Sequence, residues 1–479
     1  MFDMRRREFM TLLGGAPPVS YEEPMRDIRR DAFCVRAPAF AILALVLSFS
    51  PVLAGGLPQQ LERVVILSRH GVRSPTQDDN TLNNYRKSGI PPWPDFGVQQ
   101  LADLTLKGAL LMQRMGAHYR EKWQPRFGDP SRACPNPNPF FYADRDERTL
   151  MTARSLVGGL AGGACELPVL EIIEPDVLTE RIDPVFHPIN KTNPSCKVKN
   201  PPHPTVSPDQ VSRVQKVVDC CQADFCNKIL GKTSCDLQQL MDGTKPGTPP
   251  HNDAYNFIQG FGEILLFEYA QGFVGRNFAF GKIAPDPIRP PPADKPEWWK
   301  LLAIHADLFN KIERHRDVAL LQGANLLYHM ISAIATGRPL IPPAVGPPVN
   351  FPVKFMVYVG HDTNIANVAK LLGLHWQVGD YPADDVAPGA ALAFEVRQTL
   401  GAPPYVNALM LVQPPDSLRA DGSDIRSRPL PIRGCKSPEG SPDGSCAMSD
   451  FVSIAMNIVK KARAENSACI TDWKDDLAD

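Results

Sequence analysis

Three short apolar segments, each followed by a charged loop and then by a segment of helical periodicity, constrain the fold of this chain more than any other feature. The apolar segments cover residues 62–68, 140–143 and 354–359. The helical segments that come after them cover residues 105–124, 149–160 and 363–372. Short runs rich in β-branched and aromatic residues are typical of buried strands, and strands that alternate with helices build α/β folds. The sequence therefore predicts an α/β sheet flanked by helices.

The middle of the chain, residues 196–349, has a different character. It contains helical segments at 211–218, 257–271 and 299–335, and proline-rich stretches border it. Because proline cannot continue a helix, these stretches separate one element from the next. Strand-like segments return at 391–396 and 405–412, and a last helix is expected at 449–462. We therefore predict four parts: a leader and secretion signal at 1–54, an α/β domain in two parts at 55–195 and 350–479, and an inserted, mostly helical cap domain at 196–349.

The first 54 residues have the layout of a secretory signal. An apolar run at 37–54 follows four arginines and ends in small residues. A membrane anchor is the alternative, because spanning becomes plausible at about 18 apolar residues, but Ser48, Ser50 and Pro51 interrupt the run. A second export-like motif at 5–10 is redundant, so we expect the natural start at Met25 and a periplasmic or secreted mature protein.

Charge and cysteine content restrict the partners and the compartment. The chain has 51 Lys and Arg against 52 Asp and Glu, whereas binding to nucleic acid or to an acidic membrane requires a basic excess. We expect neither as a partner, and no membrane association after signal removal. Of 11 cysteines, Cys34 lies in the signal, and the even remainder predicts disulfides in an oxidising compartment. A zinc site is the alternative, but one group of cysteines lacks the C-x₂-C spacing such sites use. That group is Cys220, Cys221, Cys226 and Cys235.

The loop after the first strand places His70 between Arg69 and Arg73. Open α/β sheets bind ligands at the carboxyl ends of their strands. Two guanidiniums offer planar sets of N–H donors that suit phosphoryl oxygens, and their charge lowers the pKa of a nearby imidazole. A neutral histidine can attack phosphorus. The alternative is that these residues form a basic surface loop. Gly71 and Pro75, however, restrict the loop so that the three side chains can face one small volume.

The other two loops supply what the first lacks. Arg148 opens the helix after the second strand, where a helix N-terminus itself favours anions; the acids beside it, Asp144, Asp146 and Glu147, are expected to cap the helix or orient arginines. His361 and Asp362 follow the third strand. His361 can donate to a phosphate oxygen, and Asp362 can protonate a leaving alkoxide. The alternative for Asp362, or for Thr363, is a helix N-cap.

Residues 69–75 (RHGVRSP) resemble the R-H-G-x-R-x-P signature of the histidine acid phosphatases, and residues 360–364 (GHDTN) resemble their H-D element. The resemblance runs from about residue 61 to the C-terminus and is strongest with the bacterial periplasmic phytases and acid phosphatases, then with the glucose-1-phosphatases. It implies a phosphoglycerate-mutase-like mixed sheet with an inserted helical cap. It also implies the pairs Cys134–Cys165, Cys196–Cys469, Cys226–Cys235 and Cys435–Cys446, and leaves open whether Cys220 and Cys221 bridge each other or exchange.

The same resemblance implies a role for each site residue. His70 would be phosphorylated and Asp362 would protonate the leaving group. Arg69, Arg73, Arg148 and His361 would bind the phosphate. No metal or other cofactor is expected, because arginines supply the charge that a metal ion supplies elsewhere. Glu263, in the helical segment, could reach substrate.

One departure bears on the substrate. Phytases of this kind resemble R-H-G-x-R-x-P-T-K, with a lysine that can meet a second phosphate, whereas Thr76 is followed here by Gln77, Asp78 and Asp79. We therefore expect a broad acid phosphomonoesterase that acts on small phosphate monoesters through a phosphohistidine and could accept phytate. The alternatives are a glucose-1-phosphatase-like sugar phosphatase, a phosphoglycerate-mutase-like enzyme, which export and disulfides disfavour, and a periplasmic phosphate-ester binding protein without turnover. The sequence leaves the oligomeric state open.

Overall fold

The computed structural model describes residues 59–123, 139–162, 168–170, 183–186, 196–288, 295–341, 347–466 and 469. Residues from Gln59 onward form one compact unit. The predicted leader, signal and Met25 start lie outside the described residues, and so does the predicted Cys134–Cys165 pair.

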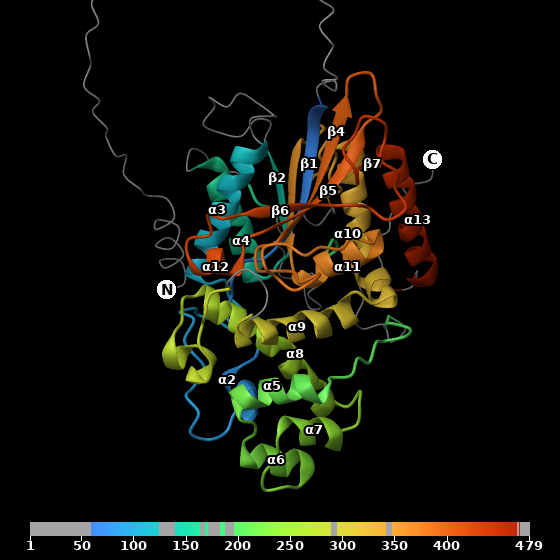
Figure 1. Ribbon diagram of the computed structural model, residues 1–479. Helices are drawn as coiled ribbons and strands as arrows, with labels where there is room; N and C mark the ends of the chain where they lie inside the picture. Colours follow the sequence, from blue (N-terminus) through green and yellow to red (C-terminus); the bar gives the residue numbers. More distant parts are fainter. Residues whose placement is uncertain are drawn as a thin grey trace, which may run out of the picture. The chain divides into compact units, whose positions relative to one another are not determined.

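A mixed sheet lies at the centre of this unit (Figure 1). Its strand order is β2-β3-β1-β4-β5-β6, and β7 pairs with β5. Both β2 and β1 run parallel to β3, whereas β4, β5, β6 and β7 pair antiparallel with their neighbours. The strands are β1 (Gln59–Arg69), β2 (Phe140–Ala143), β3 (Phe355–Gly360), β4 (Ala391–Thr399), β5 (Tyr405–Val412), β6 (Arg426–Leu430) and β7 (Cys446–Ala447). The predicted α/β sheet flanked by helices is thus confirmed, with every predicted strand present.

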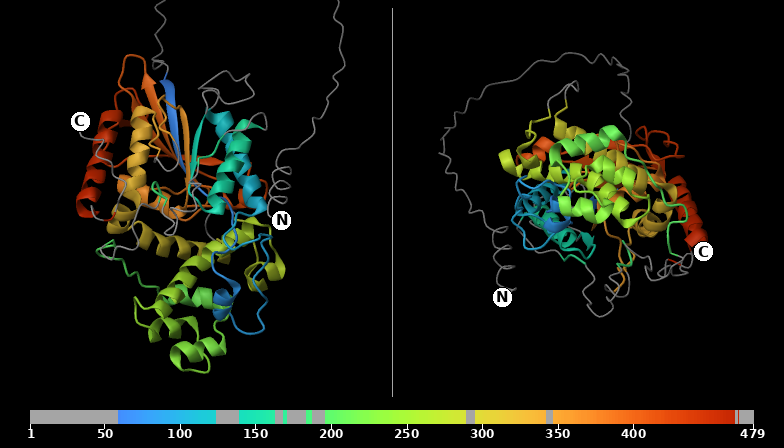
Figure 2. Two further views of the ribbon diagram at one scale, coloured as in Figure 1. Left: turned by 180° about the vertical axis from the view of Figure 1, so that it is seen from behind. Right: turned by 90° about the horizontal axis from the view of Figure 1, so that it is seen from below.

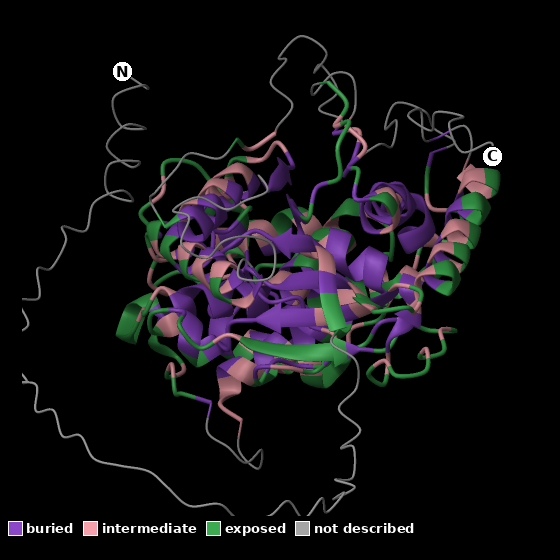
Figure 3. Ribbon diagram, turned by 90° about the horizontal axis from the view of Figure 1, so that it is seen from above, coloured by how far each residue is buried: buried purple, intermediate pink, exposed green. Residues whose placement is uncertain are grey.

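Helices cover both faces of the sheet (Figures 1 and 2). On one face, α3 (Leu106–Trp123) and α4 (Glu147–Ala161) pack on apolar side chains such as Val64, Ile66 and Val357. On the other face lie α10 (Arg316–Thr336), α11 (Asp362–Leu372) and α13 (Met448–Asn466), which pack on one another. Residues of β1 and β3 alternate between the two apolar clusters because successive side chains of a strand point to opposite faces. Figure 3 shows the central strands buried between these layers, whereas β6 is mostly exposed.

The segment between residues 196 and 349 is helical in its described parts. Its helices are α5 (Pro208–Val218), α6 (Ala223–Leu230), α7 (Leu237–Gly243), α8 (Pro249–Ala270), α9 (Glu297–Glu313) and α10. The helical segment predicted at 299–335 is confirmed, and it consists of two helices: α9 ends before Arg314, and α10 begins at Arg316. The first five helices pack mainly on one another, with α8 against α9, whereas α10 packs beside the sheet. Limits of an inserted domain at 196 and 349 therefore stay a prediction.

Two short helices outside this segment, α2 (Asp79–Asn84) and α12 (Pro415–Arg419), were not predicted, because they are too short to show helical periodicity. Among the described helices, α10 alone has the length and apolar composition to cross a membrane. Of that apolar stretch 83% is buried inside the protein. Its packing against α11, α13 and β1 accounts for the composition.

Four disulfides connect described cysteines. Cys196–Cys469, Cys226–Cys235 and Cys435–Cys446 confirm three pairs implied by the family resemblance. Cys220 and Cys221 are bonded to each other, which answers the question that the sequence left open. Because Cys221, Cys226 and Cys235 are all oxidised in these pairs, this group does not supply free thiolates for zinc.

Candidate active site

The three charged loops meet at one edge of the sheet because their strands are neighbours. In the sheet register Arg69 lies opposite Gly360, and Ala143 lies opposite Val359, so β1, β2 and β3 end at the same level. Backbone hydrogen bonds continue the pairing into the loops: the His70 N–H donates to the Gly360 carbonyl at 3.0 Å, and the Asp144 N–H to the Val359 carbonyl at 2.9 Å. Sheet topology therefore brings together the site residues that the sequence placed on separate loops.

His70 lies at the centre of the charged groups and is 2% exposed. Burial lowers the pKa of its imidazole well below the usual value, and the positive charges of Arg69, Arg73 and Arg148 and the ring of His361 lower it further. The imidazole is therefore neutral. Its Nδ1 lies 2.9 Å from the Gly71 carbonyl, which accepts hydrogen bonds only, so Nδ1 carries the proton. The lone pair then lies on Nε2, the nitrogen free to act as a nucleophile.

Gly71 is required by close packing beneath this loop. A Cβ at this position would lie 2.8 Å from Met112 Cγ and 3.1 Å from the Gly108 carbonyl oxygen of α3. The Gly71 N–H donates to Thr152 Oγ1 at 3.0 Å, which ties the loop to α4. A side chain here would push the loop away from both helices, and His70 with it.

Arg69 and Arg73 share one carboxylate from the helical segment. Glu263 of α8 contacts Arg69 through Oε1 and lies 3.1 Å from Arg73 Nη2 through Oε2. Burial by itself raises the pKa of Glu263, but the charges of Arg69 and Arg73 outweigh it and the pKa is lowered. The Arg73 guanidinium also lies over the ring of Phe267, 4.9 Å from its centroid. Glu263 was expected to reach substrate; its oxygens lie against the two arginines and fix where their N–H groups point.

Arg148 and His361 lie side by side on the other two loops. Arg148 Nη2 is 3.4 Å from His361 Nδ1 and 2.6 Å from Asp146 Oδ2. The rings of His70 and His361 meet edge to face with centroids 5.6 Å apart. On its other nitrogen, His361 Nε2 lies 2.8 Å from Asp144 Oδ2. The arginine and both histidines thus surround one small volume.

Asp362 is the first residue of α11 and pairs with Arg69. Its Oδ1 accepts the Thr363 N–H at 2.8 Å, and its Oδ2 lies 2.9 Å from Arg69 Nη2. The N-cap position belongs to His361, whose own N–H is bound by Asn364 Oδ1 at 2.7 Å. The alternative that Asp362 or Thr363 caps the helix is therefore wrong, and the Asp362 carboxyl faces the arginine cluster.

A further acid, Asp385, was not recognised in the sequence. It is 3% exposed, and the carbonyl of the next residue, Val386, accepts a hydrogen bond from Arg69 Nη1. Burial raises the pKa of Asp385 to about 6, and the negative charges of Glu263 and Asp362 add to that rise although His305 and Arg69 oppose it. It lies in an irregular loop between α11 and β4, where no periodicity marks a buried acid.

Asp144, Asp146 and His361 present ligand atoms within 4.8 Å of one another, an arrangement that could attract a metal ion. All three side chains already have partners, because Asp144 Oδ2 lies 2.8 Å from His361 Nε2 and Asp146 Oδ2 lies 2.6 Å from Arg148. The cationic Arg148 beside them disfavours a metal ion by charge repulsion. Catalysis without a metal stays a prediction.

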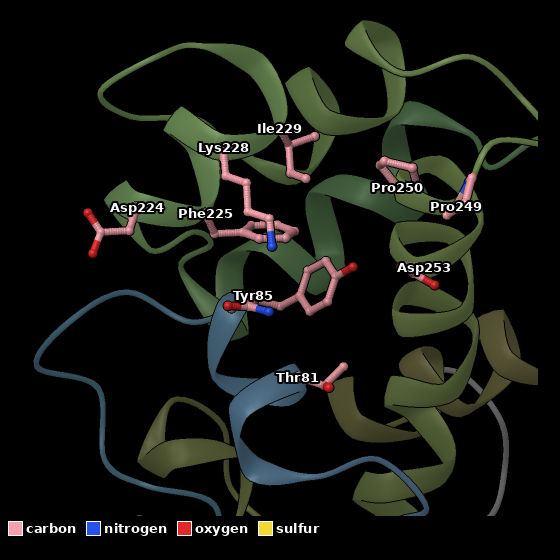
Figure 4. A pocket seen from close by; sticks show the side chains of 10 residues that line it. Thr81, Tyr85, Asp224, Phe225, Lys228, Ile229, Pro249, Pro250 and Asp253 are labelled. Atoms are coloured by element: carbon pink, nitrogen blue, oxygen red, sulfur yellow. The ribbon is translucent and has the colours of Figure 1, made fainter.

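A separate pocket of about 370 Å³ lies in the helical segment, between α2, α6 and the start of α8 (Figure 4). Tyr85 and Phe225 form its aromatic wall. Its lining includes none of the residues of the three charged loops. We therefore place the active site at the sheet edge and not in this pocket.

Comparisons with known proteins find similar sequences and structures among phosphatases. The sequence matches the Histidine phosphatase superfamily (branch 2) over residues 60–253. It is 26% identical to Phytase AppA of Escherichia coli over 455 residues, 88% of this chain and 98% of that protein. It is 27% identical to a glucose-1-phosphatase of Salmonella typhimurium over 70% of this chain and 76% of that protein. The structure of Hafnia alvei phytase in complex with tartrate superposes with a TM-score of 0.67 and 28% identity, covering 84% of this chain and 98% of that one. The chain is therefore similar to branch 2 of the histidine phosphatase superfamily over residues 60–253, and to bacterial phytases over most of its length.

Proposed function

We propose that this protein is an acid phosphomonoesterase that hydrolyses small phosphate monoesters through a phosphohistidine on His70. The observation that carries the proposal is a buried, neutral His70 surrounded by Arg69, Arg73 and Arg148. A binding protein needs the cations but has no use for a nucleophilic nitrogen held among them. The match of residues 60–253 to a phosphatase family and the similarity to phytases and glucose-1-phosphatases support the same activity.

In the first step, His70 Nε2 attacks phosphorus while the bond from phosphorus to the ester oxygen breaks. Arg69, Arg73 and Arg148 donate hydrogen bonds to the three remaining oxygens, whose negative charge is spread in the transition state. The leaving alkoxide is strongly basic and takes the proton of Asp362. A bound phosphate dianion competes with Asp362 for Arg69, which pairs with the Asp362 carboxyl at 2.9 Å.

In the second step, a water molecule attacks the phosphohistidine. The Asp362 carboxylate takes a proton from that water, the bond between phosphorus and Nε2 breaks, and His70 returns to its neutral state as inorganic phosphate forms. Asp362 ends protonated and ready for the next ester. In this cycle Asp362 donates a proton in the first step and accepts one in the second. The cycle needs no metal ion, because the arginines supply the positive charge.

We infer the substrate range from residues 76–79, which follow the first charged loop. The residues after Thr76 are uncharged or acidic, and Asp78 is engaged in the N-cap of α2, where it binds the Thr81 N–H at 2.6 Å. A specialist for a highly phosphorylated ring would gain from basic residues here. We therefore infer a broad range that includes phytate, with glucose-1-phosphate as the second candidate because two curated relatives are glucose-1-phosphatases. Initial rates on phytate, glucose-1-phosphate and an aryl phosphate will rank these substrates.

The compartment is part of the proposal. Disulfides such as Cys435–Cys446 persist in oxidising surroundings. Together with the signal-like segment at 37–54, they support export to the periplasm or secretion. The partners would be small phosphate esters, without nucleic acid or membrane.

The central test of the mechanism is Asp362→Asn. Asparagine keeps the size and the acceptor for the Thr363 N–H but has no acidic proton to donate. Hydrolysis of an alkyl or inositol phosphate should fall steeply, whereas an aryl phosphate whose phenol leaves without protonation should be largely spared. An equal loss on both ester types, with an unchanged circular dichroism spectrum, would mean that another group supplies the proton.

The nucleophile is tested by trapping. Wild-type protein quenched during turnover of a ³²P-labelled ester should carry acid-labile label, and His70→Ala should carry none and hydrolyse nothing. His203→Ala, at an exposed histidine, is the matched control and should label like the wild type. Label on His70→Ala would refute the assignment, and a wild type that binds esters without label or turnover would make the protein a binding protein.

A further inference from the structure

The two ring nitrogens of His361 have different partners. Nδ1 faces Arg148 at 3.4 Å, on the side of the phosphate site. Nε2 lies 2.8 Å from Asp144 Oδ2, whose side chain is 1% exposed. Asp144 is placed by the sheet, because it directly follows β2 and its N–H donates to the Val359 carbonyl of β3. This carboxylate is therefore fixed by backbone contacts before any ligand binds.

These contacts decide which nitrogen of His361 carries the proton. Asp144 accepts on both oxygens: Oδ1 binds the Arg145 N–H at 2.8 Å, and Oδ2 binds His361 Nε2. An ionised carboxylate has no proton to give, so Nε2 must be the donor. A guanidinium can only donate, so Nδ1 offers its lone pair to Arg148 while the phosphate site is empty. The neutral ring is the Nε2–H tautomer.

We propose that Asp144 is a positioning residue that holds the proton of His361 on Nε2 and so presents Nδ1 to the substrate phosphate. The inference rests on the proposed function, because phosphate is the group that Nδ1 would meet. On binding, a monoanionic phosphate ester gives its proton to Nδ1, which leaves the ester dianionic and His361 an imidazolium. The new N–H then donates to a phosphate oxygen, and the Asp144 carboxylate stabilises the positive ring from behind.

A second buried acid, Asp183, interacts with Asp144. Asp183 lies in the same buried region and is bound by the Tyr142 hydroxyl at 3.1 Å and by the backbone N–H groups of Val185 and Phe186. Burial raises the pKa of Asp183 to about 7, and the negative charge of Asp144 adds to the rise.

The most informative variant is Asp144→Asn. We expect it to move the proton of His361 from Nε2 to Nδ1, and not only to lower the activity. The asparagine has a single oxygen, which the Arg145 N–H requires as its acceptor. Its NH₂ group then faces His361 and donates to Nε2, which forces the proton to Nδ1. Asp146→Asn is the matched control: it removes the same charge two residues away, but Asp146 Oδ2 is 3.5 Å from Nε2 and pairs chiefly with Arg148.

The experiment is nitrogen NMR of protein labelled with ¹⁵N-histidine, at a pH where the His361 signals have stopped titrating. The signals are assigned by their disappearance in His361→Gln. We expect a protonated Nε2 and a bare Nδ1 in the wild type and in Asp146→Asn, and the reverse in Asp144→Asn. The kcat/KM of Asp144→Asn on an alkyl phosphate should fall on the order of 10- to 100-fold.

Two results would overturn the proposal. One is a wild-type His361 that carries its proton on Nδ1, which can be seen without any variant of Asp144 and so does not depend on that variant folding. The other is an Asp144→Asn protein with unchanged tautomer and unchanged kcat/KM. A wild type that shows the predicted tautomer but forms no phosphohistidine would refute the proposed function alone, because the NMR measurement does not require turnover.

Discussion

Glu268 offers the clearest case in which one proton controls the stability of this fold. The residue is 1% exposed on α8, and its Oε2 accepts the Ala279 N–H at 2.8 Å. Burial raises the pKa of its carboxyl to about 8, against 4.5 in the unfolded chain. The sign follows from linkage: stability from this group is fully present below about pH 4.5 and is lost as the pH rises towards 8.

Replacing Glu268 by glutamine removes this pH dependence. Glutamine keeps an oxygen for the Ala279 N–H but has no proton to lose. At pH 7 the wild type has lost stability over the interval from 4.5 to 7, which at 1.36 kcal/mol per pH unit is about 3 kcal/mol. Glu268→Gln should therefore be more stable than the wild type by about 3 kcal/mol at pH 7, and nearly equal to it at pH 4. For a unit of this size the gain corresponds to a rise of about 3 °C in Tm.

The assay is chemical and thermal unfolding of both proteins at pH 4 and pH 7, under non-reducing conditions that keep the disulfides intact. Glu439→Gln, at an exposed position, is the matched control and should change stability little at either pH. A gain of the same size at both pH values would mean that the glutamine acts through packing. A loss of stability at pH 7 would mean that Glu268 is ionised in the folded protein and that the reasoning from burial is wrong.

Further predictions concern the site and the whole fold. Arg73→Ala and Arg148→Ala should each lower kcat by about 10²–10³-fold, the loss expected when one transition-state donor is removed; steady-state rates that stay near the wild type would place that arginine outside the phosphate site. Chelation with EDTA should leave the activity intact, whereas phosphate, vanadate and tungstate should compete with substrate; reversible loss on chelation would indicate a metal mechanism. Burial raises the pKa of Asp183 and Glu313 to about 7 and of Asp385 to about 6, so these carboxyl groups should lower the stability of the wild type between pH 4 and 8 by more than the buried His70 and His329, whose pKa is lowered, raise it below pH 6.5. Unfolding midpoints that rise over this range would contradict those assignments.

Much of this fold was predictable because its signals are local. The strands at 62–68, 140–143 and 354–359 and the helices after them follow from apolar periodicity, which a sequence records directly. The convergence of His70, Arg148 and His361 follows from one general property, that parallel strands of a sheet end at the same edge. The break between α9 and α10 at Arg314 was not predicted, because it contains neither the glycine nor the proline that usually marks the end of a helix.

The sequence by itself determined which residues stand at the ends of the strands, and hence the histidines, the arginines and the aspartate that the candidate site brings together. Only the tertiary structure decided what holds them in place. Glu263 meets Arg69 across 194 positions of the chain, and Asp144 meets His361 across 217. An acidic residue looks the same in a sequence whether it caps a helix, faces water or binds a distant cation. Its role depends on burial and on which partner the folded chain brings within hydrogen-bonding distance, and both are properties of packing between elements that no local pattern encodes.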